Sequence, residues 1–124
     1  MWQKAKAMAV DVYRVSESLP KAEMYGLTSQ VRRAAVSVAS NIAEGQGRLT
    51  KGEFGHFLGQ ARGSLLELET QLEIALDLGF VSQPEFDRLC ELFRGTQIAQ
   101  PSYRLCTGKQ QISTKVARNL KLET

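Results

Sequence analysis

The chain has 124 residues, of which 43% are hydrophobic, and this length suits one domain with a single continuous core. No apolar run approaches the roughly 20 residues that cross a bilayer, so no membrane association is expected. The first residues carry charges among their apolar side chains and lack a signal-peptide core. These features predict a cytoplasmic protein.

The net charge of +3 is unevenly distributed along the chain. Residues 101–124 carry five basic side chains and one acidic side chain, so residues 1–100 sum to −1. Within that part, residues 1–64 hold nine basic and five acidic side chains, whereas residues 65–100 hold two and seven. The body of the protein is therefore polarised, and its overall positive charge does not by itself indicate a nucleic-acid partner.

The first predicted helix runs from about residue 2 to residue 19 and ends at Pro20, which cannot continue it. In the connector that follows, Tyr25 and Leu27 are expected to cover the end of the core. The core face of the helix repeats at intervals of three and four. It comprises Trp2, Ala5, Ala9, Val12, Ser16 and Leu19.

The second predicted helix begins near Thr28, a residue type that caps helix N-termini. Its core positions are Val31, Ala35, Val38 and Ile42. Most of its other directions carry small residues, which let a neighbouring element approach closely. This pattern suits an inner helix or a helix packed on a neighbouring subunit, and we favour the second alternative. The small residues are Ala34, Ser37, Ala39, Ser40 and Ala43.

The third predicted helix has the strongest periodicity and begins with a capping box formed by Thr50 and Glu53. Gly79 ends it, and a second capping box, Ser82 and Glu85, begins the fourth helix. The predicted core positions of these two helices are Phe54, Leu58, Ala61, Leu65, Leu68, Leu72, Ala75, Phe86, Leu89, Cys90, Phe93 and Ile98.

Four amphipathic helices with short connections predict an all-α protein, an antiparallel up-and-down four-helix bundle over residues 1–100. After Thr96 the helical rhythm fails, so the fourth helix is expected to be truncated or irregular there. Residues 101–124 are interpreted as an irregular basic tail. Degenerate codons permit an alternative frame that continues an apolar helix. A shifted reading frame after about residue 99 is therefore a hypothesis that the DNA sequence tests.

The stretch "SNIAEGQGR", residues 40–48, connects the second and third helices. Gly45 is predicted to be a left-handed C-cap, and Gly47 a second permissive hinge. A phosphate cradle would need a preceding strand and a lysine at fixed spacing, and both are missing. Glu44 and Arg48 are placed to pair across the turn, although an exposed pair contributes little.

Two longer stretches carry a family resemblance, "YGLTSQVRRAAVSVASNIAEGQGR" and "EFGHFLGQARGSLLELETQLEIALDLGF". They closely resemble bacterial four-helix bundle proteins encoded within intervening sequences of large-subunit ribosomal RNA genes. The resemblance extends from about residue 2 to residue 96, and its most specific part is Asn41 to Gly45 with Gly47 and Arg48. It implies bundles assembled as homo-oligomeric rings of five and no enzymatic activity. A related branch, the accessory variability determinant proteins, binds nucleic acid and assists a reverse transcriptase.

Five basic residues on the second helix, the turn and the early third helix form the candidate nucleic-acid-binding set: Arg32, Arg33, Arg48, Lys51 and Arg62. A ring would repeat this set around its axis, and repeated cations bind a phosphate backbone through counterion release. The alternative is a solvated face whose arginines pair with neighbouring acids. Aromatic residues that would stack unpaired bases are not interleaved, so sequence-specific readout is not expected.

Other polar residues do not suggest an active site. Glu69, Glu73 and Asp77 are spaced four apart, but they flank the core positions. They are interpreted as surface acids, or as partners for basic residues of an adjacent subunit, rather than as metal ligands. A single histidine, His56, cannot complete a hydrolytic triad with the available serines. Cys90 and Cys106 lack metal-ligand spacing and are expected to be buried or incidental thiols. Neither a cofactor nor a metal is predicted, and Asn41 is expected to be a buried residue that fixes helix register.

Two functions from different classes follow from these observations. The first is a non-enzymatic ring that binds an RNA or DNA backbone, or assists a nucleic-acid enzyme, through its basic face. The second is a protein–protein assembly module with no nucleic-acid role.

Overall fold

The protein is described by a computed structural model, which covers residues 1–96 and residue 98. Four α-helices make up almost all of this part of the chain, and a short 3₁₀ helix, η1 (Lys21–Glu23), lies between the first two. Within these described residues there is no strand, which confirms the all-α prediction. The helices are α1 (Trp2–Ser16), α2 (Leu27–Gln46), α3 (Lys51–Asp77) and α4 (Gln83–Gly95).

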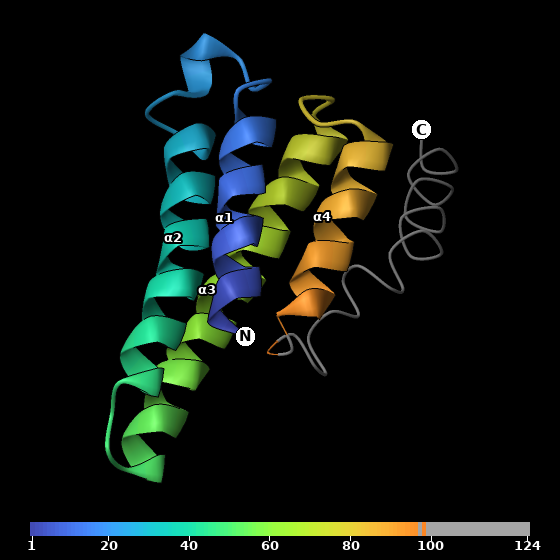
Figure 1. Ribbon diagram of the computed structural model, residues 1–124. Helices are drawn as coiled ribbons and strands as arrows, with labels where there is room; N and C mark the ends of the chain where they lie inside the picture. The colour runs from blue at the N-terminus through green and yellow to red at the C-terminus, as the bar shows by residue number, and fades with distance from the viewer. Residues whose placement is uncertain (97, 99–124) are drawn as a thin grey trace, which may run out of the picture.

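Successive helices run in opposite directions, which confirms the antiparallel up-and-down bundle (Figure 1). Each helix packs against two neighbours: α2 lies against α1 and α3, and α4 lies against α1 and α3. Because α2 and α3 are longer than their partners, their hairpin extends beyond the ends of α1 and α4 (Figure 1). The bundle therefore has one end where only two helices pack together.

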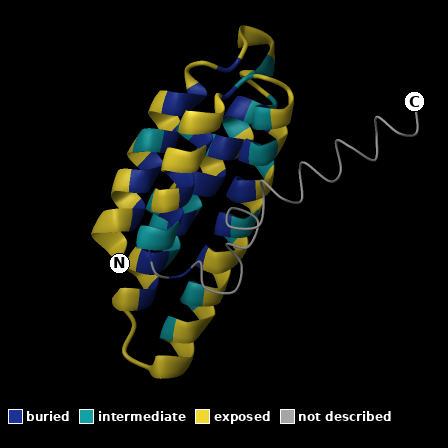
Figure 2. Cartoon of the chain, turned by 90° about the vertical axis from the view of Figure 1, so that its right-hand side faces the viewer, coloured by how far each residue is buried: buried dark blue, intermediate teal, exposed yellow. Residues whose placement is uncertain are grey.

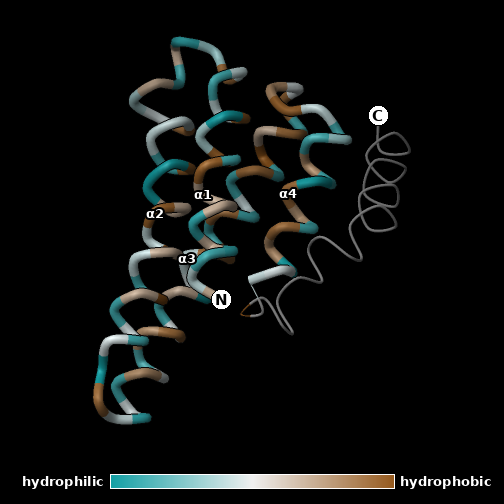
Figure 3. The backbone as a smooth tube through the Cα atoms, in the orientation of Figure 1, coloured by the Kyte–Doolittle hydropathy of each residue, from teal (hydrophilic) through white to brown (hydrophobic). Residues whose placement is uncertain are grey.

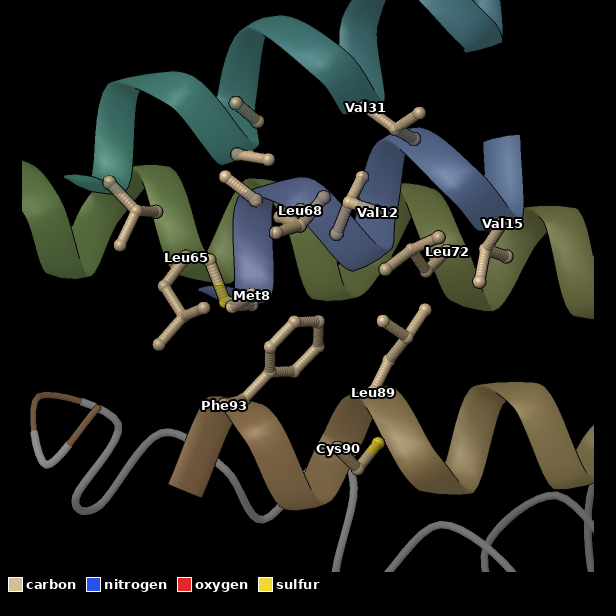
Figure 4. Packing of buried hydrophobic residues seen from close by; sticks show 14 of the residues in the cluster. Met8, Val12, Val15, Val31, Leu65, Leu68, Leu72, Leu89, Cys90 and Phe93 are labelled. Atoms are coloured by element: carbon tan, nitrogen blue, oxygen red, sulfur yellow. The ribbon is translucent and has the colours of Figure 1, made fainter. Parts of the chain in front are cut away.

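The core is formed by apolar residues that recur along each helix (Figure 3). Phe93 and Leu89 of α4 point across the bundle toward Met8, Leu65 and Leu72 (Figure 4). All five side chains are buried, and complete burial of such a side chain contributes roughly 1.5–3 kcal/mol. The projecting end of the hairpin is mostly exposed (Figure 2), so it adds little to this core.

The predicted helix starts and stops are largely confirmed. The Thr50 hydroxyl accepts a hydrogen bond from the Glu53 amide at 3.1 Å, and Ser82 and Glu85 form a complete capping box. Gly79 has a φ of +80° just after α3, the left-handed conformation that glycine adopts without strain. The N-terminus of α2 differs from the prediction, because Gly26 is its N-cap and Thr28 is buried inside the helix.

One helix end and two apolar positions in the first part of the chain were wrongly predicted. Helix α1 ends at Ser16 rather than near Leu19, although Leu19 is still buried. Trp2 is 38% exposed, whereas Met8 and Val15, which were not assigned to the core face, are buried. Tyr25 is 94% exposed and covers nothing, whereas Leu27 packs against the core as expected.

The remaining predictions concern the end of α4, the two cysteines, the C-terminal tail and membrane association. Helix α4 ends at Gly95, and the predicted basic tail, residues 101–124, lies outside the described part of the chain. Cys90 is buried, which agrees with one of the two expectations, but it is not a free cysteine, so the prediction of a thiol is wrong for this residue. Cys106 lies outside the described residues. None of the described helices is long and apolar enough to span a bilayer.

Candidate nucleic-acid interface

Arg32 and Arg33 are consecutive on α2 but point to different neighbours, because each helical residue turns the side chain by about 100°. Arg32 faces α1, where its Nε donates a 2.7 Å hydrogen bond to the Ser16 hydroxyl. Its guanidinium also lies 4.9 Å from the centre of the Tyr13 ring. Arg32 is half-buried and serves the α1–α2 contact, so it offers little charge to a ligand.

Arg33 lies at the edge of a polar groove between α2 and α3, with a volume of about 300 Å³. Its side chain is exposed and makes no hydrogen bond or ion pair with any described residue. Across the base of the groove, the Ser37 and Ser64 hydroxyls are 2.8 Å apart. The other lining residues are Gln30, Ala34, Glu67 and Gln71.

Arg48 and Lys51 lie at the projecting end of the hairpin. The Arg48 guanidinium pairs with the Glu44 carboxylate at 3.0 Å and lies 4.8 Å from the centre of the Phe57 ring. Both members of this pair are exposed, so solvent weakens the interaction and the arginine remains accessible. Lys51 begins α3, is exposed and makes no ion pair within the described residues.

Arg62 is on the side of α3 that faces α4. Its Nε donates a 3.2 Å hydrogen bond to the backbone carbonyl of Ile98, just beyond the end of α4. This bond connects α3 to the segment after α4. Arg62 is therefore placed apart from the groove and from the α2–α3 turn.

The five predicted cations consequently form separate positions rather than one patch. Arg33 lies 13 residues before the end of α2, which corresponds to about 20 Å along the helix axis. Arg48 and Lys51 lie beyond that end, at the turn. A single chain thus presents two accessible positive regions at a distance from each other.

The motif residues Asn41, Glu44, Gly45 and Gly47 lie on the same end of α2. The Asn41 amide donates to the backbone carbonyl and the hydroxyl of Ser37, at 2.8 and 3.0 Å. Because Ser37 contacts Ser64 of α3, Asn41 joins a small polar network at the α2–α3 contact. Asn41 is half-buried rather than buried, but the network fits its predicted role in fixing register.

Gly45 is not the predicted left-handed C-cap. It lies inside α2 and is buried, and the helix ends one residue later with a C-cap at Gly47 whose φ is −84°. A Cβ atom at Gly45 would lie 3.1 Å from the Cβ of Phe57 and 3.4 Å from the Phe54 carbonyl oxygen. The glycine is needed because α3 approaches α2 closely here.

Glu69 is the largest error in the sequence-based reading of polar residues. It was predicted to be a surface acid, but its side chain is completely buried, and neither carboxylate oxygen has a hydrogen-bond partner among the described residues. Burial, with a smaller contribution from the charge of Glu73, raises the pKa of Glu69 from 4.5 to about 7.

A sequence signal for the burial of Glu69 existed. Leu65, Glu69, Leu72 and Leu76 repeat at intervals of four, three and four, the rhythm of a buried face. Glu69 therefore belongs to the buried side of α3, whereas the prediction assigned it to a solvent-facing flank. No group of three metal-ligating side chains occurs in residues 1–96 and 98, so Glu69 does not belong to a metal site formed by them.

Comparison with known proteins identifies one relationship. The model of a family described as 23S rRNA-intervening sequence protein matches residues 1–98. Among curated proteins, nothing matches the chain. The family match ends where the described part of the structure ends and includes all five candidate cations and the four motif residues.

Proposed function

The chain belongs to the 23S rRNA-intervening sequence protein family, and from this premise we propose that it is a non-enzymatic, ring-forming bundle that binds RNA or DNA. The phosphate backbone is the proposed ligand, and the cations of α2 and early α3 are the proposed contacts. A nucleic-acid enzyme such as a reverse transcriptase is a proposed partner of the same complex. No catalytic role is assigned to any residue.

The observation that carries the proposal is the state of Arg33 and Lys51, which are exposed and have no ion-pairing partner within the described residues. A cation without an ion-pairing partner is free to contact a phosphate, and the nucleic-acid backbone then releases the counterions condensed on it. Arg48 adds to Lys51 at the turn, because its exposed pair with Glu44 is easily replaced. A ring would multiply these few contacts per chain into a continuous positive surface.

The proposal predicts salt-dependent binding without marked sequence preference. Substituting Arg33→Gln and Lys51→Gln together should weaken binding to a duplex and flatten the dependence of log affinity on log salt by roughly two, about 0.9 for each lost phosphate contact. Fluorescence anisotropy with labelled duplexes at several salt concentrations measures both quantities. Extending the substitutions to Arg32 and Arg48 should flatten the slope further, mainly through Arg48.

The matched control replaces Lys4 and Lys21 by glutamine, since both are exposed and the net charge changes equally. Binding that weakens equally in the two double variants would show that overall charge, and not this surface, attracts the nucleic acid. Removing residues 101–124 removes five further basic residues. Binding that disappears with this segment but survives the substitutions would move the interface to the C-terminal tail.

The second candidate is a protein-assembly module without a nucleic-acid role. An apolar groove between α1 and α2, lined by residues that include Val10, Tyr13 and Val36, favours it. A stable oligomer that binds neither RNA nor DNA even at 50 mM salt would place this candidate ahead.

A further inference from the structure

The groove between α1 and α2 has a volume of about 340 Å³ and an almost entirely apolar lining. Val10 and Tyr13 of α1 are each 43% exposed, and Val36 of α2 is 45% exposed. Exposed apolar side chains that gather on one surface indicate a site of interaction with another protein surface. The remaining lining residues are Lys6, Ala9, Ala39 and Ser40.

Long basic side chains stiffen the rim of this groove. The Arg32 guanidinium lies on the Tyr13 ring and is bonded to Ser16, as described above. The Lys6 ammonium lies 5.3 Å from the centre of the Trp2 ring, so its aliphatic stem follows the same surface. These contacts hold the aromatic rings in place before any partner arrives, which lowers the entropy lost on docking.

Helix α3 carries a feature that its own chain does not use. Gly52, Gly55, Gly59 and Gly63 are all exposed, and a Cβ atom added at any of them would meet nothing within 4 Å. Their spacing of three, four and four residues places them along one face of the helix. Each glycine lowers the stability of the helix relative to alanine, and no packing contact among the described residues offsets this cost.

We propose that the glycine face of α3 from one copy of this chain lies in the α1–α2 groove of a second copy. A third helix approaches a groove between two helices most closely where its facing side chains are small, because side chains widen a helix to about 10–12 Å. Glycines remove that obstacle over about 16 Å, the length of eleven helical residues. The apolar rim of the groove then packs against bare backbone.

The spacing of the two surfaces matches in an antiparallel alignment. Along α1, the residues Tyr13, Val10, Lys6 and Trp2 follow one another at intervals of three, four and four. Along α3, the four glycines follow one another at the same intervals. One alignment therefore places each large side chain of α1 opposite one glycine: Tyr13 opposite Gly52, Val10 opposite Gly55, Lys6 opposite Gly59 and Trp2 opposite Gly63.

The two faces belong to different sides of the chain. Helices α1 and α3 are separated in the bundle by α2 and α4, which both contact them. A contact between different faces of identical chains is heterologous and leaves one free face at each end, so it extends until a ring closes. This contact would be the interface of the ring in the proposed function, so the inference rests on ring formation. It does not depend on nucleic-acid binding.

The glycine face is tested by Gly55→Leu and Gly59→Leu together in the full chain, without nucleic acid. Light scattering at tens of micromolar should report a mass several times 13.8 kDa for the wild type and a monomer for the variant. The variant should remain helical by circular dichroism, since leucine favours a helix over glycine and meets open space. A Gln83→Leu control on the exposed start of α4 should keep the wild-type mass.

The groove is tested by Val10→Glu and Val36→Glu together, which should also give a monomer. Each double variant retains the face that the other has lost, so an equimolar mixture should form one-to-one pairs of twice 13.8 kDa and nothing larger. Such pairs also demonstrate that both variants are folded.

Three results would contradict the proposed interface. They differ in whether the ring of the proposed function is contradicted as well. A wild-type chain that stays monomeric removes both the ring and the interface. A glycine-face variant that keeps the wild-type mass removes the interface and leaves the ring. Two monomeric variants that do not pair when mixed remove the groove-to-glycine contact, because complementary faces must restore it.

Discussion

Replacing Glu69 by glutamine is expected to raise the free energy of unfolding by about 3 kcal/mol at pH 8 and to leave it nearly unchanged at pH 4. The reason is the position of the carboxyl group, which is completely buried and has no hydrogen-bond partner in the described part of the chain. An ionised carboxylate at such a site loses its hydration without compensation. Glutamine has nearly the same shape and carries no charge.

The pH window of the effect follows from the two pKa values. The Glu69 carboxyl titrates near 4.5 in the unfolded chain and at about 7 in the folded chain, so the folded state binds more protons between these values. Stability therefore falls as the pH rises through this window, and the loss is complete above pH 7. Urea unfolding of both proteins at several pH values measures the difference.

Glu67→Gln is the matched control, because Glu67 is two residues earlier on the same helix and exposed. Its effect should stay within about 0.5 kcal/mol at every pH, as is usual for surface substitutions. A Glu69→Gln variant whose advantage does not grow between pH 4 and pH 8 would show that the carboxyl group is hydrated or paired in solution.

The core of the bundle was predictable because local periodicity determines it. Leu65, Leu68 and Leu72 of α3 and Leu89 and Phe93 of α4 were identified by spacing alone, and all are buried. The apolar residues of a long helix repeat along one face, and that face packs into the core. The capping residues were predictable for a similar reason, since their hydrogen bonds connect groups only three residues apart.

The errors concern features that depend on how far neighbouring helices extend. Trp2 has the spacing of a core residue, but it is the first residue of α1 and its side chain is 38% exposed. Glu69 has the spacing of a core residue as well, and its charge suggested exposure, although its side chain is completely buried. In both cases the residue's own chemistry is a poor guide, because the position of a second helix decides the burial.

The sequence identified which residues belong to the candidate site, but it did not show how they are arranged on the surface. Arg32 and Arg33 are adjacent in sequence, yet one is bonded to α1 and the other lies at the α2–α3 groove. The four glycines of α3 were visible in the sequence from the start. Their exposure was not predictable, because only the structure shows that an added Cβ atom at each of these glycines would meet no described residue of the same chain.

Replacing Gly45 by leucine is expected to lower the free energy of unfolding by about 2 kcal/mol, within the range for overpacked positions. The new side chain would start 3.1 Å from the Cβ of Phe57 and 3.4 Å from the Phe54 carbonyl oxygen, closer than ordinary van der Waals contact. Both neighbours belong to the backbone or the root of a side chain on α3, so neither moves without moving the helix. The hairpin would have to open, and thermal or urea unfolding records the loss.

Gly47→Leu is the matched control within the same motif. Gly47 has a φ of −84°, which leucine adopts without strain, and an added Cβ would lie 3.6 Å from its nearest neighbour, an ordinary contact. Its substitution should therefore change the free energy of unfolding by no more than about 0.5 kcal/mol. If the two variants were equally stable, the close approach of α2 and α3 could not be the reason for a glycine at position 45. Equal destabilisation of both would instead indicate that the turn, rather than the helix contact, requires the two glycines.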